Sequence, residues 1–292
     1  MTAVQAPGLR IGGTAPTRIM GVLNVSTESP YDPSVFTEPD RAAAYVETEL
    51  VGQGADIVDV GLVSANKRFD VQPPDGELDR LAMATETIGA VAGDPVFSIE
   101  TRYAEVADEA LSKGFDMVND ICGFADPEMR AVAEAHDVPI VKMAGSGTCA
   151  RPGAVEEVDW AGEKSSAWAE EADFVDKVYA ALERGGLTEK TIVDPAFGGW
   201  SEAQTLSADR ATFRALQRFQ RLDRPILVSI NRKNFLRKLV GRSTEDALPV
   251  SLAATAMAVE RGADVIRTHD VLATRDAAMV ADELGVQIGP NE

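Results

Sequence analysis

Polar residues of the kinds that bind a charged ligand recur at the ends of short apolar runs in this sequence. Such residues are Asn24, Glu100, Asn119 and Asp194, and two clusters, Asn231-Arg232-Lys233 and Arg267-Thr268-His269-Asp270, follow later runs. Any one of them could cap a helix or bond within a loop. If they all reach one opening, their carboxylates, amides and cations suit a polar heterocycle that carries a charged tail.

Arg267 and His269 indicate an anion clamp. They lie two residues apart, so on an extended strand both side chains leave the same face. A guanidinium offers a rigid fork to phosphate oxygens, and an imidazole adds a further donor. The alternative is a structural pair, with Arg267 bridging to a carboxylate and His269 bonded within its loop. The other histidine, His136, is expected to be structural, near the end of a helix.

Glu100, Asn119, Asp194 and Lys233 would serve the ring of such a ligand. The first three offer acceptors and an amide, and Lys233 adds a donor. This set complements a ring edge that has amino and ring N–H donors beside a carbonyl acceptor. Asp194 also precedes a proline, which is a common way to open a turn.

These residues need a scaffold that brings strand ends together, and the chain predicts one. Short β-branched runs alternate with stretches of helical period, which is typical of consecutive βα units. The predicted strands are 18–24, 56–61, 96–101, 116–121, 138–143, 191–194, 226–230 and 264–268. The predicted helices are 39–53, 77–91, 104–112, 127–135, 168–184, 205–221, 244–261 and 274–284.

About eight parallel strands close into a barrel, so the sequence predicts a single (β/α)8 barrel. One domain would span residues 1–292, with its core at about 18–285. The active sites of such barrels lie at the carboxyl ends of the strands, where the polar residues fall. Two segments, 61–75 and 144–167, are longer than simple turns and are interpreted as substrate loops or as surface excursions.

The composition of the chain argues against some classes of binding partner. Acidic residues outnumber basic ones 47 to 28, a net charge of −19, which argues against binding to nucleic acid or to an anionic membrane. No apolar run is long enough for a membrane helix and no secretory signal is present, so we expect a cytoplasmic protein. Cys122 and Cys149 are expected to be reduced. The acidic, arginine-biased composition resembles that of salt-adapted proteins.

The strand motifs together resemble the dihydropteroate synthase family, from about Ile19 to Leu284. The similar segments are 20–26 (MGVLNVS), 56–61 (DIVDVG), 98–101 (SIET), 118–121 (VNDI), 194–198 (DPAFG), 231–233 (NRK) and 267–270 (RTHD). Each segment is a weak signal, but their order and spacing are specific. The resemblance implies joining of 4-aminobenzoate, or a related arylamine, to (7,8-dihydropterin-6-yl)methyl diphosphate, with release of pyrophosphate.

The resemblance also implies roles for single residues. Pterin contacts would come from Glu100, Asn119, Asp194 and Lys233. Asn24, Arg267 and His269 would hold the diphosphate, with Asn24 also a ligand of Mg²⁺, and Lys233, Arg267 and His269 would be catalytic. The family further implies a homodimer built on barrel helices.

Several positions depart from the family pattern. Glu100 replaces an aspartate, and residues 61–67 (GLVSANK) replace a Gly-Gly-Glu-Ser-Thr-Arg-Pro stretch. Lys67 or Arg68 could substitute for the missing cation. Lys142-Met143 replaces a His-Met pattern. Two alternatives therefore stay open: another pterin-site barrel, such as a methyltetrahydrofolate:corrinoid methyltransferase, and a non-catalytic pterin-binding relative.

Overall fold

A ring of parallel strands forms the centre of the molecule. The computed structural model describes residues 2–25, 35–63, 74–124, 126–144, 171–197 and 206–285. Eight of its strands form one parallel sheet in the order β8-β7-β6-β5-β4-β3-β10-β9. Their bounds are β3 Arg18–Asn24, β4 Ile57–Gly61, β5 Val96–Thr101, β6 Met117–Asp120, β7 Ile140–Met143, β8 Thr191–Asp194, β9 Leu227–Val228 and β10 Val265–Thr268.

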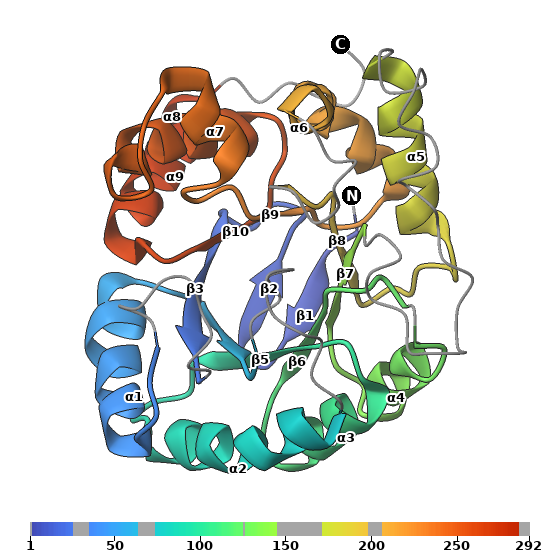
Figure 1. The fold of residues 1–292 in the computed structure, drawn as a ribbon. Helices are drawn as coiled ribbons and strands as arrows, with labels where there is room; N and C mark the ends of the chain where they lie inside the picture. The colour runs from blue at the N-terminus through green and yellow to red at the C-terminus, as the bar shows by residue number, and fades with distance from the viewer. Residues whose placement is uncertain are drawn as a thin grey trace.

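The two outer strands of this sheet meet, which closes the barrel. Val193 of β8 forms a parallel bridge with Ile226, immediately before β9. The N–H of Val193 donates to the carbonyl of Pro225 at 2.9 Å. Helices surround the strands as an outer ring (Figure 1). The chain is therefore a (β/α)8 barrel, as its alternating pattern predicts.

The helices of the ring alternate with the strands along the chain. Their bounds are α1 Pro39–Tyr45, α2 Pro74–Ala90, α3 Ala104–Ser112, α4 Met129–Ala135, α5 Glu171–Glu183, α6 Leu206–Arg214, α7 Asn234–Val240, α8 Leu248–Glu260 and α9 Val271–Leu284. Helix α1 continues into a π-helical turn, Val46–Leu50, and a 3-10 turn, Val51–Gln53. No described helix combines the length and the apolar character needed to cross a membrane.

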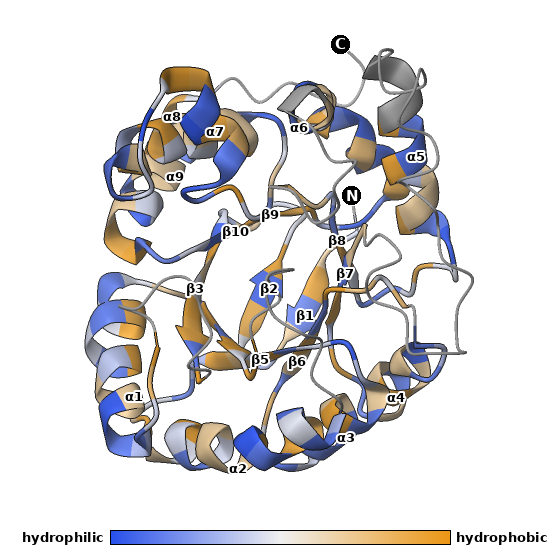
Figure 2. Ribbon diagram, viewed as in Figure 1, coloured by the Kyte–Doolittle hydropathy of each residue, from blue (hydrophilic) through white to orange (hydrophobic). Residues whose placement is uncertain are grey.

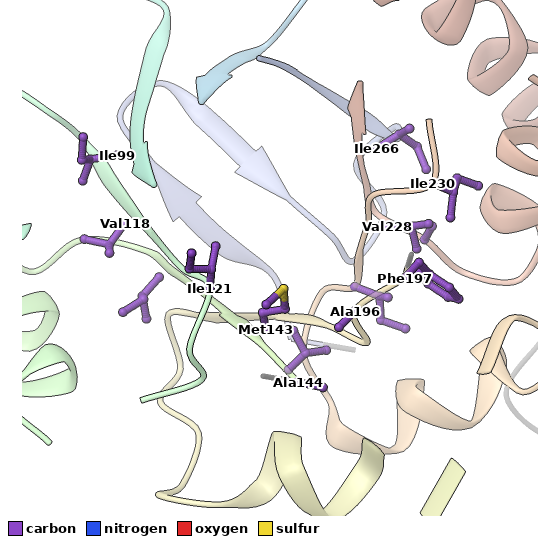
Figure 3. Packing of buried hydrophobic residues seen from close by; sticks show 14 of the residues in the cluster. Ile99, Val118, Ile121, Met143, Ala144, Ala196, Phe197, Val228, Ile230 and Ile266 are labelled. Carbon is purple, nitrogen blue, oxygen red and sulfur yellow. The ribbon is translucent and has the colours of Figure 1, made fainter. Parts of the chain in front are cut away.

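Alternate residues of each strand face the helices or the barrel interior. The outward side chains form the large apolar core, including Ile99, Val118, Val228 and Ile266 (Figure 3). Hydropathy follows this arrangement: the strands are mainly hydrophobic, whereas the helices carry both kinds of residue (Figure 2). The fold is therefore stabilised chiefly by burial of apolar surface between the barrel and its ring of helices.

The amino-terminal end of the barrel has a second apolar layer. One inward side chain from each strand contributes to it: Met20, Ile57, Val96, Met117, Val141, Ile192, Leu227 and Val265. An antiparallel hairpin of β1 (Val4–Ala6) and β2 (Leu9–Ile11) covers this layer with Val4, Ala6 and Ile11. The hairpin lies across the middle of the ring in Figure 1. It closes one end of the barrel, so a ligand has to enter from the other.

A Gly-X-Asp sequence recurs at 54–56, 114–116 and 262–264, and its aspartates have a common function at this closed end. The carboxylates of Asp56, Asp116 and Asp264 accept the backbone N–H groups of Ile19, Phe97 and Ile226, at 2.9, 2.9 and 2.8 Å. Each aspartate thus precedes its own strand and satisfies a donor at the start of a neighbouring one. The glycines Gly54, Gly114 and Gly262 adopt positive φ, as helix ends before such strands require.

Some features differ from the sequence predictions. The hairpin and α7 were not predicted, and helix 205–221 divides into α6 and a 3-10 segment, Leu216–Leu222. Cys122 is disulfide-bonded, so the prediction of two reduced thiols is wrong. Most of the long segments 61–75 and 144–167 lies outside the described residues, together with Lys67 and Arg68.

Candidate active site at the carboxyl end of the barrel

Arg267 occupies the centre of the open end. It is the third residue of β10, and its side chain points inward. Its Nε donates to Oδ2 of Asp59 at 2.7 Å, and its Nη2 donates to Oε2 of Glu100 at 2.6 Å. The side chain is only 15% exposed, so both ion pairs are largely shielded from water. Burial opposes the charge of Arg267, but Glu100 and Asp59 raise its pKa overall, and it stays a cation.

Asn119 joins the same network through Asp59. Its Nδ2 donates to Oδ2 of Asp59 at 2.9 Å, and the side chain is buried near the end of β6. Strand register explains the meeting, because Asp59 pairs with Ser98 on β5, and Glu100 pairs with Asn119 on β6. Three neighbouring strands thus contribute Asp59, Glu100 and Asn119 to one wall of the opening.

Asp194 and Lys233 lie on the other side of the barrel. Burial raises the pKa of Asp194 to about 6, with Lys233 and Arg267 acting in the opposite direction. Burial and the nearby Arg267 lower the pKa of Lys233, whereas Asp194 and Glu100 raise it. The charges of Asp194, Lys233, Arg267 and Glu100 therefore influence one another. Asp194 also opens the expected turn, since its Oδ1 accepts the N–H of Ala196 at 2.8 Å.

His269 follows β10 and is held by the neighbouring loop. Its backbone N–H donates to Oδ1 of Asn231 at 3.4 Å. Burial, and then the charge of Arg267, lower the pKa of His269 to about 3, so the imidazole is neutral near pH 7. Asp270 fastens the two loops, accepting from Nε and Nη2 of Arg232 at 2.8 and 2.9 Å and from Asn231 at 2.9 Å. This places the Asn231-Arg232-Lys233 cluster beside His269.

Asn24 completes the ring at the end of β3. A methyl group added to Gly61 would stand 3.1 Å from Oδ1 of Asn24 and 3.8 Å from Oε1 of Glu100. The glycine therefore leaves a space that both oxygens face. Among the described residues, no group of three or more His, Cys, Asp or Glu side chains could hold a metal ion by itself.

All seven residues selected from the sequence thus lie at one end of the barrel: Asn24, Glu100, Asn119, Asp194, Lys233, Arg267 and His269. The sequence interpretation missed Asp59, which gave no signal of its own because it stands inside a strand rather than at its end. Asp120, next to Asn119, faces away from the opening and accepts the N–H groups of Cys122 and Phe124. His136 ends α4 and contacts Asp108 at 2.7 Å, a structural position as expected.

Lys142, at the position of the missing His-Met pattern, points out of the barrel. It is fully buried, and its ammonium group donates to the carbonyl of Arg184 and stands 4.7 Å from the centre of the Phe124 ring. Burial lowers the pKa of Lys142 to about 8. The substitution therefore replaces a residue of the family pattern with one that fastens the end of α5, outside the site.

Comparison with known proteins agrees with this geometry. A family model described as pterin binding enzyme matches residues 20–269. A dihydropteroate synthase of Bacillus subtilis is 30% identical over 92% of this chain and 88% of its own length. A probable bifunctional folylpolyglutamate synthase/dihydropteroate synthase of Haloferax volcanii is 34% identical over 87% of this chain. The match spans only 29% of that longer relative.

Solved structures are similar over the whole fold. The dihydropteroate synthase of Xanthomonas albilineans with 4-aminobenzoic acid has a TM-score of 0.74 at 27% identity, covering 99% of this chain and 100% of that one. Its complex with 7,8-dihydropteroate has a TM-score of 0.72 at 26% identity, covering 98% and 100%. Sequence, barrel topology and site geometry lead to one conclusion: the chain belongs to the dihydropteroate synthase family of pterin-binding enzymes.

Proposed function

We propose that this chain condenses (7,8-dihydropterin-6-yl)methyl diphosphate with 4-aminobenzoate to give 7,8-dihydropteroate and pyrophosphate. The observation that carries the proposal is the convergence of Arg267, Glu100, Asn119, Asp194 and Lys233 at the open end of the barrel. Relatives of this family bind 4-aminobenzoic acid and 7,8-dihydropteroate. Family membership makes this reaction a better candidate than corrinoid-dependent methyl transfer.

Each group has a part in the proposed binding. The acceptors of Glu100, Asn119 and Asp194 would take the N–H donors of the pterin edge, with Lys233 donating to its carbonyl. Arg267 and His269 would donate to the diphosphate. His269 is neutral before binding, so we propose that it acts as a hydrogen-bond donor rather than as a cation.

The reaction then needs charge stabilisation rather than a covalent intermediate. The bond between the methylene carbon and the diphosphate oxygen breaks, and the leaving oxygen keeps the electron pair. Arg267 would stabilise the negative charge that develops there, and the pterin ring would delocalise the positive charge left on the carbon. The lone pair of the arylamine nitrogen forms the new C–N bond, and the nitrogen loses a proton.

Magnesium would balance the charge of the diphosphate. The carboxylates of Asp59, Glu100 and Asp194 face the cations Arg267 and Lys233, so the site has no surplus positive charge for a polyanion. Asn24 fits the ion, because its Oδ1 borders the oxygen-lined space above Gly61. Mg²⁺ commonly takes one or two protein oxygens together with substrate phosphates and water. When bound, it would neutralise the developing charge on the leaving group.

We also propose that a second copy of this chain packs against α7, α8 and α9. Among the described residues, every exposed large hydrophobic side chain lies on these helices: Leu239, Val240, Met257, Leu272, Met279, Val280 and Leu284. Such a concentration is typical of an association surface. Sedimentation should give a dimer for the wild type and a monomer for Met279→Glu/Val280→Glu, whereas a monomeric wild type would contradict the proposal.

We propose that the protein is cytoplasmic and adapted to high salt. The charge of −19 supports the salt adaptation. Crowded carboxylates repel one another, and added salt screens that repulsion. We expect the free energy of unfolding to rise between low and molar salt. A fold that is indifferent to salt over this range would contradict the adaptation.

The direct test is an assay of the purified chain with the pterin diphosphate, 4-aminobenzoate and Mg²⁺ at low and high salt. Pyrophosphate and dihydropteroate should form together, and only when the arylamine is present. Asp194→Asn should lose most activity, whereas Asp116→Asn, at the closed end of the barrel, should keep it. A folded protein that binds the pterin and releases neither product would instead be a non-catalytic pterin-binding protein.

A further inference from the structure

Asp59 is a charged residue of the opening that stands in the middle of its strand. It is the third residue of β4 and is fully buried. A single oxygen, Oδ2, accepts from Nδ2 of Asn119 at 2.9 Å and from Nε of Arg267 at 2.7 Å. Asn119 lies in the proposed pterin half of the site, and Arg267 lies in the proposed diphosphate half. Asp59 therefore contacts both halves at one atom.

These two contacts fix the orientation of both partners. An ionised carboxylate can only accept, so Asn119 has to turn its NH2 group toward Asp59, which leaves its Oδ1 for a ligand that donates. The bond to Nε of Arg267 sets the plane of the guanidinium, because the group is rigid. Because the Asp59 side chain is buried, bulk water does not compete with either bond.

Arg267 has a second carboxylate partner, Glu100, but the two differ. The Glu100 side chain is 10% exposed and stands where a ligand would enter, so a ligand can take over its bond to Arg267. The Asp59 side chain is 0% exposed, and its Oδ1 has no hydrogen-bond partner among the described residues. A buried charge of this kind is costly, and Arg267 is the cation that compensates it. We therefore expect the Asp59–Arg267 ion pair to persist when a ligand binds, whereas the Glu100–Arg267 pair can be exchanged for the ligand.

We propose that Asp59 is a positioning residue that couples the pterin and diphosphate halves of the site, so that binding of one substrate part orders the groups that receive the other. This rests on the proposed function. Asp59 itself touches neither substrate part. It acts through Asn119 and Arg267, and ordering of a shared element by the first ligand lowers the cost of binding the second.

The coupling can be measured without turnover. The dissociation constant of a free 6-hydroxymethylpterin is determined by its fluorescence, with and without saturating pyrophosphate and Mg²⁺. In the wild type we expect pyrophosphate to tighten pterin binding by about tenfold, a typical coupling between two sites. In Asp59→Asn the amide can donate to Asn119, which allows that side chain to turn over, and the factor should fall to about one. The same variant should lose about 10²-fold in kcat, as small misplacements of reacting groups do.

Ser98→Ala is the matched control. Ser98 is paired with Asp59 across β4 and β5, is equally buried, and its Oγ has no hydrogen-bond partner among the described residues. It should keep the coupling factor of the wild type. Thermal unfolding checks that each variant is folded, and Asp59→Ser, which removes both hydrogen bonds with a smaller side chain, provides a second test.

The outcomes separate this inference from the proposed function. If Asp59→Asn weakens both ligands but leaves the coupling factor unchanged, Asp59 is merely structural and the inference is overturned. A second outcome is that the wild type shows coupling, Asp59→Asn loses it, and the wild type makes no dihydropteroate. In that case the inference holds and the proposed reaction fails. A wild type that binds no pterin would overturn both.

Discussion

The two ends of the barrel are built from the same strands but carry opposite chemistry. Ile57 and Val265 belong to the apolar layer under the hairpin, whereas Asp59 and Arg267, two residues further along the same strands, form a buried ion pair. Two residues of strand span roughly 7 Å. One inward position per strand therefore separates the part that stabilises the barrel from the part that could bind a ligand, so each part can be changed alone.

The largest expected effect is at the open end. Arg267→Lys keeps a positive charge but loses the fork that bonds Asp59, Glu100 and a ligand together. We expect kcat/KM, measured by pyrophosphate release, to fall by about 10³-fold. Arg130→Lys, on the half-exposed face of α4, is the control and should be neutral. Activity within a factor of a few of the wild type after Arg267→Lys would contradict the assigned role of Arg267 at the open end.

Substitutions in the apolar layer of the closed end should lower the stability of the fold and leave kcat unchanged. Ile57 is fully buried, so Ile57→Ala removes apolar contacts and leaves a cavity. The free energy of unfolding, measured with urea, should fall by ~2–5 kcal/mol. At a temperature where the variant is folded, kcat should stay close to that of the wild type. A loss of kcat as large as that of Arg267→Lys would show that the two ends are not separable.

Ligand binding at the open end should depend on pH. Burial raises the pKa of Asp194 to about 6, so protonation near that pH removes an acceptor for the pterin. The dissociation constant of a free pterin should rise about tenfold between pH 7 and pH 5. A free pterin avoids titration of a diphosphate. Asp194→Asn should bind weakly with a flatter profile, and a flat wild-type profile would count against the assigned role.

The smallest effect concerns a carboxylate of the closed end. Burial raises the pKa of Asp264 to about 7. Because the folded-state pKa is raised, the stability that its protonation gives is complete below the unfolded value and is lost as pH rises through about 7. Asp264→Asn can still accept the N–H of Ile226. We expect it to gain ~1 kcal/mol in unfolding free energy at pH 8 and less at pH 5. A destabilised variant at pH 8 would contradict this sign.

The sequence predicted the barrel because local patterns determine it. Alternation of β-branched and helical stretches gave the bounds of β3, β5 and β8 to the residue. The strand-end residues could be grouped because parallel strands bring their carboxyl ends to one rim. The hairpin escaped notice because strands of three residues are too short to show a period. Helix α7 follows the Asn231-Arg232-Lys233 cluster directly, and its seven residues are too few to show a helical period.

Asp59 could not be found in this way. Within the run Ile57–Gly61 it is one polar residue among apolar ones, and nothing local distinguishes it from a strand residue facing solvent. Its partners are 60 and 208 residues away, and only strand register brings them together. The outward direction of Lys142 likewise depends on the register of β7 with β6 and β8. Local sequence patterns therefore do not identify residues whose role depends on contacts between strands.

The most direct measurement is a crystal structure of this chain with 7,8-dihydropteroate and pyrophosphate. We expect the pterin ring to lie between Asn119, Asp194 and Lys233 and the pyrophosphate to lie on Arg267 and His269. Asp59 should still be bonded to both Asn119 and Arg267. Ligands bound beneath the β1–β2 hairpin or on the helical surface, with the open end of the barrel unchanged, would contradict it.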